Sequence, residues 1–353
     1  MFTVISAHIV SKGNIILSNE PIISFLACVL YAMGVCSMDA YALISGYVGV
    51  DTKFKFSRFA LLWFNVLFYS VVITIIFIII KPNCVGIKEL AKSFFPIMTE
   101  SYWYFTAYFC VFLFSPIINL GMNNMSRNQL KYCAFSIIIA FSFLQILFGE
   151  KLGTNGGCSG FWLIVLYIFG AYIRKTDFLP KLKSGYAFAC YFLLILLACA
   201  SKVFAEHMSV KLGLESTIGS LLSNQSGRLM HFISPLIVVA AVCIFTSFNK
   251  MKFTNKGIIK TIGFFSPLAF SVYLIHVHPL IWAYAPWSYF EVFATFNPIK
   301  MLIYTLISTI VIFILCALID KLRLTLFGAI KLKQKLDSLE FKLCRKIQKQ
   351  DVL

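Results

Sequence analysis

Residues 37–58 decide the fold, and their sequence is Ser-Met-Asp-Ala-Tyr-Ala-Leu-Ile-Ser-Gly-Tyr-Val-Gly-Val-Asp-Thr-Lys-Phe-Lys-Phe-Ser-Arg. An acid, Asp39, lies near the middle of an apolar run, and the cations Lys53, Lys55 and Arg58 precede the next run. A carboxylate at mid-membrane depth costs about 2.5–3.5 kcal/mol on insertion scales, so it usually faces a cavity or a polar partner. The cations indicate either an anion-binding loop at the membrane edge or a loop that only fixes topology.

The composition is that of an integral membrane protein. Of the 353 residues, 60% are hydrophobic and only 13% are charged, which lies far from the usage of a soluble domain. The apolar runs are about 20 residues long, as a helix needs to cross a bilayer, whereas the strands of a membrane barrel alternate over shorter segments. The sequence therefore predicts an all-α, polytopic transmembrane helix bundle.

The formal net charge of +17 has two explanations. Nucleic-acid binding is one, but the excess of cations in the cytoplasmic loops of membrane proteins is the simpler one, so no nucleic-acid partner is expected. The 11 cysteines show no paired metal spacing, and most lie inside apolar runs as small hydrophobic residues. We therefore expect no metal.

The apolar runs predict about ten helices. Residues 1–10 span only about 15 Å at helical rise, so we interpret them as the outer half of a truncated first helix. The other nine helices are expected at 22–47, 59–80, 102–121, 132–149, 159–173, 185–204, 229–248, 261–282 and 299–320.

The distribution of Lys and Arg predicts the orientation. If the loop 48–58 is cytoplasmic and the sides then alternate, 22 of the 31 cations lie on the cytoplasmic side. This arrangement divides the chain into a membrane-embedded domain, residues 1–320, and a cytoplasmic tail, residues 321–353. The tail is basic and amphipathic, and we expect it to lie along the lipids of the inner leaflet.

Several short motifs occur in order along these helices. They are His8, Tyr41-Ala-Leu-Ile-Ser-Gly-Tyr47, Lys55-Phe-Ser-Arg58, Tyr102-Trp-Tyr-Phe-Thr-Ala-Tyr108, Leu113-Phe-Ser-Pro-Ile-Ile-Asn119, Leu166-Tyr-Ile-Phe-Gly-Ala-Tyr-Ile-Arg-Lys175 and Ser271-Val-Tyr-Leu-Ile-His-Val-His-Pro-Leu280. Together they resemble the membrane-bound acyltransferase-3 family, bacterial enzymes that O-acylate surface polysaccharides and related glycans. The resemblance extends from Met1 to about Asp320.

The resemblance implies an O-acyltransferase of the bacterial inner membrane, with an O-acetyltransferase as the expected form. The donor would be cytoplasmic acyl-CoA, with acetyl-CoA expected, and the acceptor a surface glycan or a lipid-linked sugar. Two features depart from the family pattern. A basic residue usual about eleven positions before the histidine would precede Met1, and Lys55 replaces the first Arg of a common Arg-x-x-Arg motif. Lysine keeps the charge but loses the bidentate fork of arginine.

His8 and Asp39 are the predicted catalytic residues. Residue type alone favours an interfacial histidine at a helix end for His8. The resemblance implies instead that His8 is the base that takes the proton of the acceptor hydroxyl. Asp39 would then orient His8 or stabilise its protonated form, as carboxylates do for histidines in other acyl-transfer sites. The alternative for Asp39 is a structural hydrogen bond to another helix.

Lys55 and Arg58 fit the phosphates of a coenzyme A donor, with Arg174 assisting from a neighbouring loop. The alternative is that these cations only set topology. His276, Tyr102 and Trp103 are expected on the acceptor side. For the two aromatic residues, an interfacial aromatic belt is the simpler explanation, and stacking on a sugar ring is the second. The His-x-His spacing of His276 and His278 lacks a third metal ligand.

Two other functions stay open from the sequence. A non-enzymatic transporter or flippase of lipid-linked sugars would use the same buried polar groups as a translocation path. An inactive, truncated acyltransferase is the other.

Overall fold

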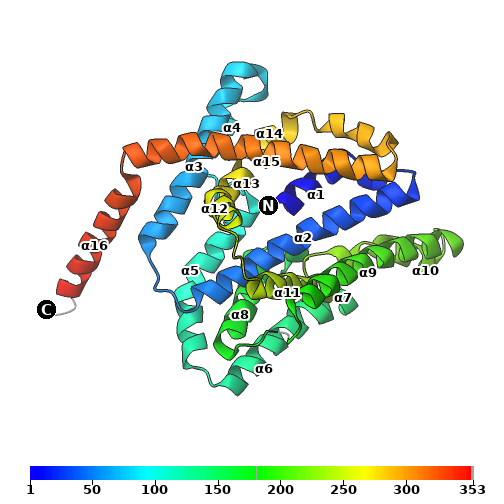
Figure 1. Ribbon diagram of the computed structural model, residues 1–353, viewed down its shortest axis with the longest axis horizontal. Coiled ribbons are helices and arrows are strands. Elements are labelled where there is room, and N and C mark those ends of the chain that lie inside the picture. Colours follow the sequence, from blue (N-terminus) through cyan, green and yellow to red (C-terminus); the bar gives the residue numbers. More distant parts are fainter. Residues whose placement is uncertain (180, 351–353) are drawn as a thin grey trace. The chain divides into compact units, whose positions relative to one another are not determined.

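A computed structural model of the protein describes residues 1–179 and 181–350. Its regular structure consists of helices, with no strand among the described residues (Figure 1). The α-helices are α1 (Phe2–Lys12), α2 (Pro21–Gly49), α3 (Phe56–Ile80), α4 (Ile87–Ser93), α5 (Trp103–Asn124), α6 (Arg127–Ile138), α7 (Leu144–Phe148), α8 (Gly160–Thr176), α9 (Ser184–Lys211), α10 (Thr217–Gln225), α11 (Pro235–Lys250), α12 (Lys256–Phe265), α13 (Ala269–His276), α14 (Pro279–Tyr284), α15 (Pro298–Ala329) and α16 (Leu332–Gln350).

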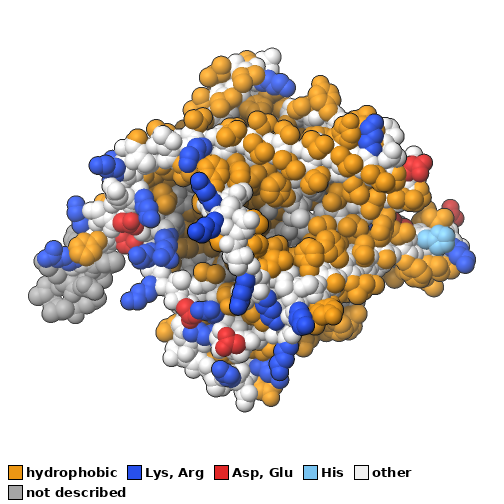
Figure 2. All heavy atoms as spheres, viewed as in Figure 1, with side chains coloured by type: hydrophobic (Ala, Val, Ile, Leu, Met, Phe, Trp, Pro, Cys, Tyr) orange, Lys and Arg blue, Asp and Glu red, His pale blue; other side chains and the backbone are white. Residues whose placement is uncertain are grey.

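The predicted helix bundle is confirmed. In the described part of the chain, eight helical segments are long and apolar enough to cross a membrane. The remaining two of the ten predicted helices correspond to α1 and α8, which have 11 and 17 residues. Large apolar side chains cover much of the face shown in Figure 2, a surface that suits lipid better than water. On α15 alone the exposed ones include Ile303, Leu306, Ile307, Ile310, Val311, Ile314, Leu315 and Leu318.

Two predicted helices differ from the structure, and proline explains both differences. The predicted helix 261–282 is divided into α12, α13 and α14, because Pro267 and Pro279 lack the N–H that a continuous helix requires. The predicted helix 229–248 begins instead at Pro235, which occupies the first turn of α11, where its missing N–H costs nothing.

The described contacts divide the chain into two compact units. Unit 1 comprises residues 1–52, 107–253 and 286–310, and unit 2 comprises residues 53–106, 254–285 and 311–353. In unit 1, α2 is the central helix and packs against α1, α8, α9 and α11, while α9 and α11 lie side by side. In unit 2, α3 has the same central role and packs against α4, α13, α14 and α16.

Glycine allows the backbones of α2 and α8 to come into direct contact in unit 1. A Cβ atom on Gly46 would clash with the backbone carbonyl of Tyr167, and a Cβ on Gly170 would clash with that of Leu43. The two backbones therefore touch without side chains between them, as small residues allow in membrane helices. The outer contacts, Asp39 with Trp162 and Asp51 with Arg174, follow the same order along both segments, so α2 and α8 are parallel.

Buried polar pairs join the helices of unit 2. Asn65 of α3 donates to the Ser271 hydroxyl of α13 at 3.1 Å. The Tyr69 hydroxyl donates to Asp320 at 2.7 Å, and Arg323 donates to the same carboxylate at 2.6 and 3.2 Å. In an apolar surrounding, each polar group needs such a partner, so these bonds specify which faces of α3, α13 and α15 meet.

Candidate functional site

The first helix is held from two sides in unit 1. Thr3 bonds Ser37 of α2 at 2.7 Å, and Ser6 bonds Thr309 of α15 at 2.9 Å. Ala7 packs against Gly34, where any Cβ would clash with it. His8 is the next residue of α1 after Ala7, and its side chain is half-buried. A short helix thus positions the predicted base through hydroxyl pairs on two neighbouring helices.

Asp39 lies on another face of α2 than the one that meets α1. It is fully buried, and its Oδ1 atom accepts a hydrogen bond from the Trp162 indole of α8 at 3.1 Å, whereas Oδ2 has no partner. At about 100° per residue, Asp39 is about 140–160° around α2 from Gly34 and Ser37. The bond from Trp162 is the structural bond to another helix that the sequence left open.

Lys55 and Arg58 are exposed at the start of α3 in unit 2. Neither cation forms an ion pair with any carboxylate of the described chain. The helix N-terminus beside them is occupied by Glu340 of α16, which accepts from the backbone N–H groups of Phe56 and Ser57 at 2.7 and 3.2 Å. Contacts with Ser57, the amide of Phe56 and the nearby Lys55 charge lower the pKa of Glu340, so its carboxyl is ionised at neutral pH.

Arg174 is engaged at the end of α8 in unit 1. Its Nε atom donates to Asp51 at 3.0 Å, and its guanidinium lies 5.2 Å from the centre of the Tyr47 ring. Lys175 reaches the same carboxylate at 2.8 Å. Hydrogen bonds from Lys175 and then Arg174 lower the pKa of Asp51. A phosphate bound by Arg174 would have to compete with this carboxylate.

Tyr102 and His276 are buried in an aromatic cluster of unit 2. Tyr102 is 1% exposed, and its ring centre lies 6.3 Å from that of Tyr273 and 6.1 Å from that of His278. Its hydroxyl has no hydrogen-bond partner. Trp103, the first residue of α5, is partly exposed and contacts Tyr104 edge to face. Burial leaves Tyr102 unsuited to the sugar stacking that an interfacial tyrosine offers, whereas Trp103 keeps that capacity.

The two histidines of the cluster differ in their bonding. His276 is 3% exposed, and its Nδ1 lies 2.6 Å from the carbonyl of Val272, so Nδ1 carries the proton and Nε2 the lone pair of the neutral ring. His278 uses both nitrogens in the fold. Its Nε2 donates to the Ser70 carbonyl at 3.2 Å, and its Nδ1 accepts from the N–H of Leu280 at 3.2 Å. His278 therefore joins α14 to α3, whereas the Nδ1 atom of His276 bonds to the backbone of its own helix.

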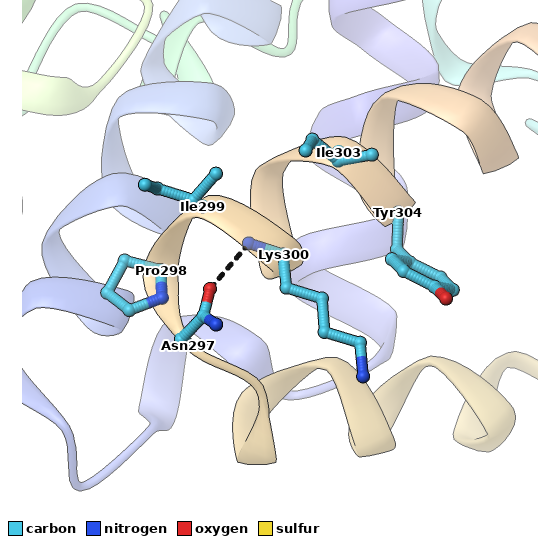
Figure 3. A pocket seen from close by; sticks show the side chains of 6 residues that line it. All are labelled: Asn297, Pro298, Ile299, Lys300, Ile303 and Tyr304. Carbon is cyan, nitrogen blue, oxygen red and sulfur yellow. Dashed lines mark hydrogen bonds between the residues drawn. The ribbon is translucent and has the colours of Figure 1, made fainter.

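An apolar hollow of about 560 Å³ lies at the start of α15 in unit 1 (Figure 3). Its lining includes Lys300, whose Nζ atom is 4.2 Å from the centre of the Phe296 ring and 5.6 Å from that of Tyr304. Asn297 caps the helix by accepting from the Lys300 backbone N–H at 2.8 Å. None of the predicted site residues lines this hollow.

Sequence reasoning missed Glu340 and the role of Trp162. Glu340 is one of three acids in a basic tail, and no sequence pattern connects it with the start of α3, 284 residues earlier. Trp162 lies in the predicted helix 159–173, and helical periodicity does not indicate which helix its indole reaches.

Long apolar helices with buried polar pairs between them define a multi-pass membrane protein. Comparison with protein families narrows this class: the sequence matches the family described as an acyltransferase domain over residues 1–321. The chain therefore belongs to the acyltransferase-3 family and is a membrane acyltransferase. Comparisons with curated proteins and with solved structures returned no match.

Proposed function

We propose that the protein transfers an acyl group, acetyl in the expected case, from cytoplasmic acyl-CoA to a hydroxyl of a surface or lipid-linked glycan. Family membership over residues 1–321 is the observation that carries this proposal. The protein would reside in the bacterial inner membrane, with the tail after Asp320 in the cytoplasm, because Lys and Arg concentrate on that side.

His8 is the base in this proposal. The imidazole takes the proton from the glycan hydroxyl while the oxygen forms a bond to the acyl carbon, and the carbon–sulfur bond of the thioester breaks to release coenzyme A. The proton is then returned to the thiolate or to solvent. The support from the structure is that hydroxyl pairs on either side of α1 restrict its position, and that His8 is half-buried rather than fully exposed.

Lys55 and Arg58 bind the donor phosphates in this proposal. Both side chains are exposed and have no carboxylate partner among the described residues, so their charge is available to an anion. Arg174 is a weaker candidate, because Asp51 already neutralises it. Trp103 and His276 remain proposed acceptor-side residues, and the Tyr102 hydroxyl, which is buried without a partner, is a candidate hydrogen-bonding group for the same side.

The test is transfer by the purified protein in lipid nanodiscs. Acetyl-CoA with a labelled acetyl group is added with a lipid-linked or soluble bacterial glycan, and both free thiol and labelled glycan are measured. We expect the two products to appear in equal amounts. Movement of a lipid-linked sugar across the bilayer with neither product would instead identify a flippase.

A further inference from the structure

The last helix, α16, packs on α3 of unit 2 through one narrow face. Leu332, Leu336 and Glu340 follow one another at four-residue spacing on α16, and all three are half-buried where the helix packs on α3. Leu339, Phe341 and Leu343 are more than half exposed. So little buried surface means that α16 can leave α3 at low cost.

Glu340 makes the polar contact of this face of α16. Its two carboxylate oxygens accept from Phe56 and Ser57, the first two residues of α3, whose amides have no partner within the helix. The positive end of the helix dipole favours a negative group at this position. Glu340 therefore occupies the start of α3 as an anion supplied by a distant part of the chain. Lys55 and Arg58 lie beside it, and it forms no ion pair with either.

A donor phosphate would use the same groups. Free amides at a helix start, together with Lys55 and Arg58 within the first four residues, are the elements with which proteins hold phosphate. The carboxylate of Glu340 is held by the amides that a phosphate at Lys55 and Arg58 would reach. Both anions cannot accept from the same two N–H groups at once.

We infer that Glu340 is an internal competitor of the donor: α16 closes the phosphate site at the start of α3, and acyl-CoA binds when α16 moves away. This inference rests on the proposed role of Lys55 and Arg58. It adds a regulatory role for the tail. The donor binds only to the fraction of molecules in which the site is open, so the apparent affinity is reduced by that fraction.

The experiment measures the binding of acetyl-CoA to the full chain in nanodiscs, with Glu340→Gln as the test variant. Glutamine keeps the size of the side chain and removes its charge. Loss of a charge at an exposed helix start should tighten the apparent Kd by about two- to fivefold at low ionic strength. The gain should shrink as salt is added, because salt screens exposed charges. Asp337→Asn is the matched control: it removes one acid from the same helix at an exposed position, and its Kd should equal that of the wild type.

Lys55→Ala and Arg58→Ala separate this inference from the proposed function. If both weaken binding while Glu340→Gln equals the wild type, the donor site stands and competition by Glu340 is refuted. If Glu340→Gln and Asp337→Asn tighten binding equally, the effect is one of net charge, and the inference fails. If Glu340→Gln tightens binding but Lys55 and Arg58 are indifferent, the donor lies elsewhere and the inference again fails. Absence of acetyl-CoA binding in all variants overturns the proposed donor together with the inference.

Discussion

Trp162 and Asp39 join α8 to the middle of α2 through one buried hydrogen bond, with the indole nitrogen 3.1 Å from Oδ1. The tryptophan is the third residue of α8, so the bond fixes where that helix begins against its neighbour. A carboxylate that accepts from an indole in an apolar interior contributes to the assembly of the two helices.

The first prediction concerns this pair. Trp162→Phe keeps an aromatic ring but leaves Asp39 without a donor, and it should destabilise the protein by about 1–3 kcal/mol. Asp39→Asn keeps the accepting oxygen, so stability and transfer rate should change little. Thermal unfolding in detergent and the transfer assay measure both quantities. A large loss of turnover in Asp39→Asn at unchanged stability would restore the hypothesis that Asp39 orients His8.

His8→Ala should remove the base and slow transfer by about 10²–10⁴-fold, the usual contribution of positioned acid–base catalysis. His8→Gln retains polarity but cannot take the proton, so its loss should be nearly as large. The measurement is labelled-acetyl transfer to the glycan at equal amounts of folded protein. His207→Gln, a change at an exposed histidine of α9, is the control and should behave as wild type. Near-normal transfer by His8→Ala would move the role of base to His276, whose Nε2 carries the lone pair.

Lys55→Ala and Arg58→Ala should raise the KM for acetyl-CoA by about tenfold or more, because each removes a charge-assisted contact with phosphate. The KM for the glycan should not change. Lys53→Ala removes a neighbouring exposed cation outside the Lys-x-x-Arg pattern and should have a smaller effect. An equal effect of all three changes would indicate a general attraction by the loop rather than a site.

Orientation is tested by cysteine labelling in intact cells. In a cysteine-free background, Lys335→Cys should be protected from an impermeant thiol reagent, because the tail is predicted to be cytoplasmic. Leu152→Cys lies in a loop predicted on the opposite side, is exposed, and should be labelled at once. Rapid labelling at position 335 would refute the proposed topology.

Asp51 should make a small, pH-dependent contribution to stability. Because the folded state lowers its pKa, the ion pair with Lys175 and Arg174 stabilises the protein above the ordinary carboxyl pKa of 3.8 and loses this effect as the pH falls further. Asp51→Asn should lower the Tm slightly at pH 7, and the difference from wild type should disappear at acidic pH. A difference that does not shrink as the pH falls below 3.8 would contradict the ion-pair explanation. Solvent exposure of the pair keeps the effect small.

The helices could be predicted from sequence because the length and polarity of a membrane span are constrained by the bilayer itself. Breaks within helices were harder. Pro267 lies inside an apolar run that otherwise continues, whereas α5 contains Pro116 and remains one helix, so proline alone does not decide where a helix ends.

The contacts of the candidate site could be predicted only in part. Lys55, Arg58 and His8 follow from motifs, since each lies in a short local pattern. The partner of Asp39 does not, because helical periodicity says which face a residue occupies and not which helix covers that face. The same holds for Glu340 and the start of α3, which lie at opposite ends of the chain.

In unit 1, the parallel helices α2 and α8 cross in direct backbone contact. Side chains can absorb sliding between helices by changing rotamer, but the carbonyl groups of Leu43 and Tyr167 rest directly on Gly170 and Gly46 and cannot. The Asp39–Trp162 bond lies towards one end of this contact, and the Asp51–Arg174 pair lies at the other end. We therefore expect any helix movement during acyl transfer to occur elsewhere in the chain, with α2 and α8 as the fixed reference.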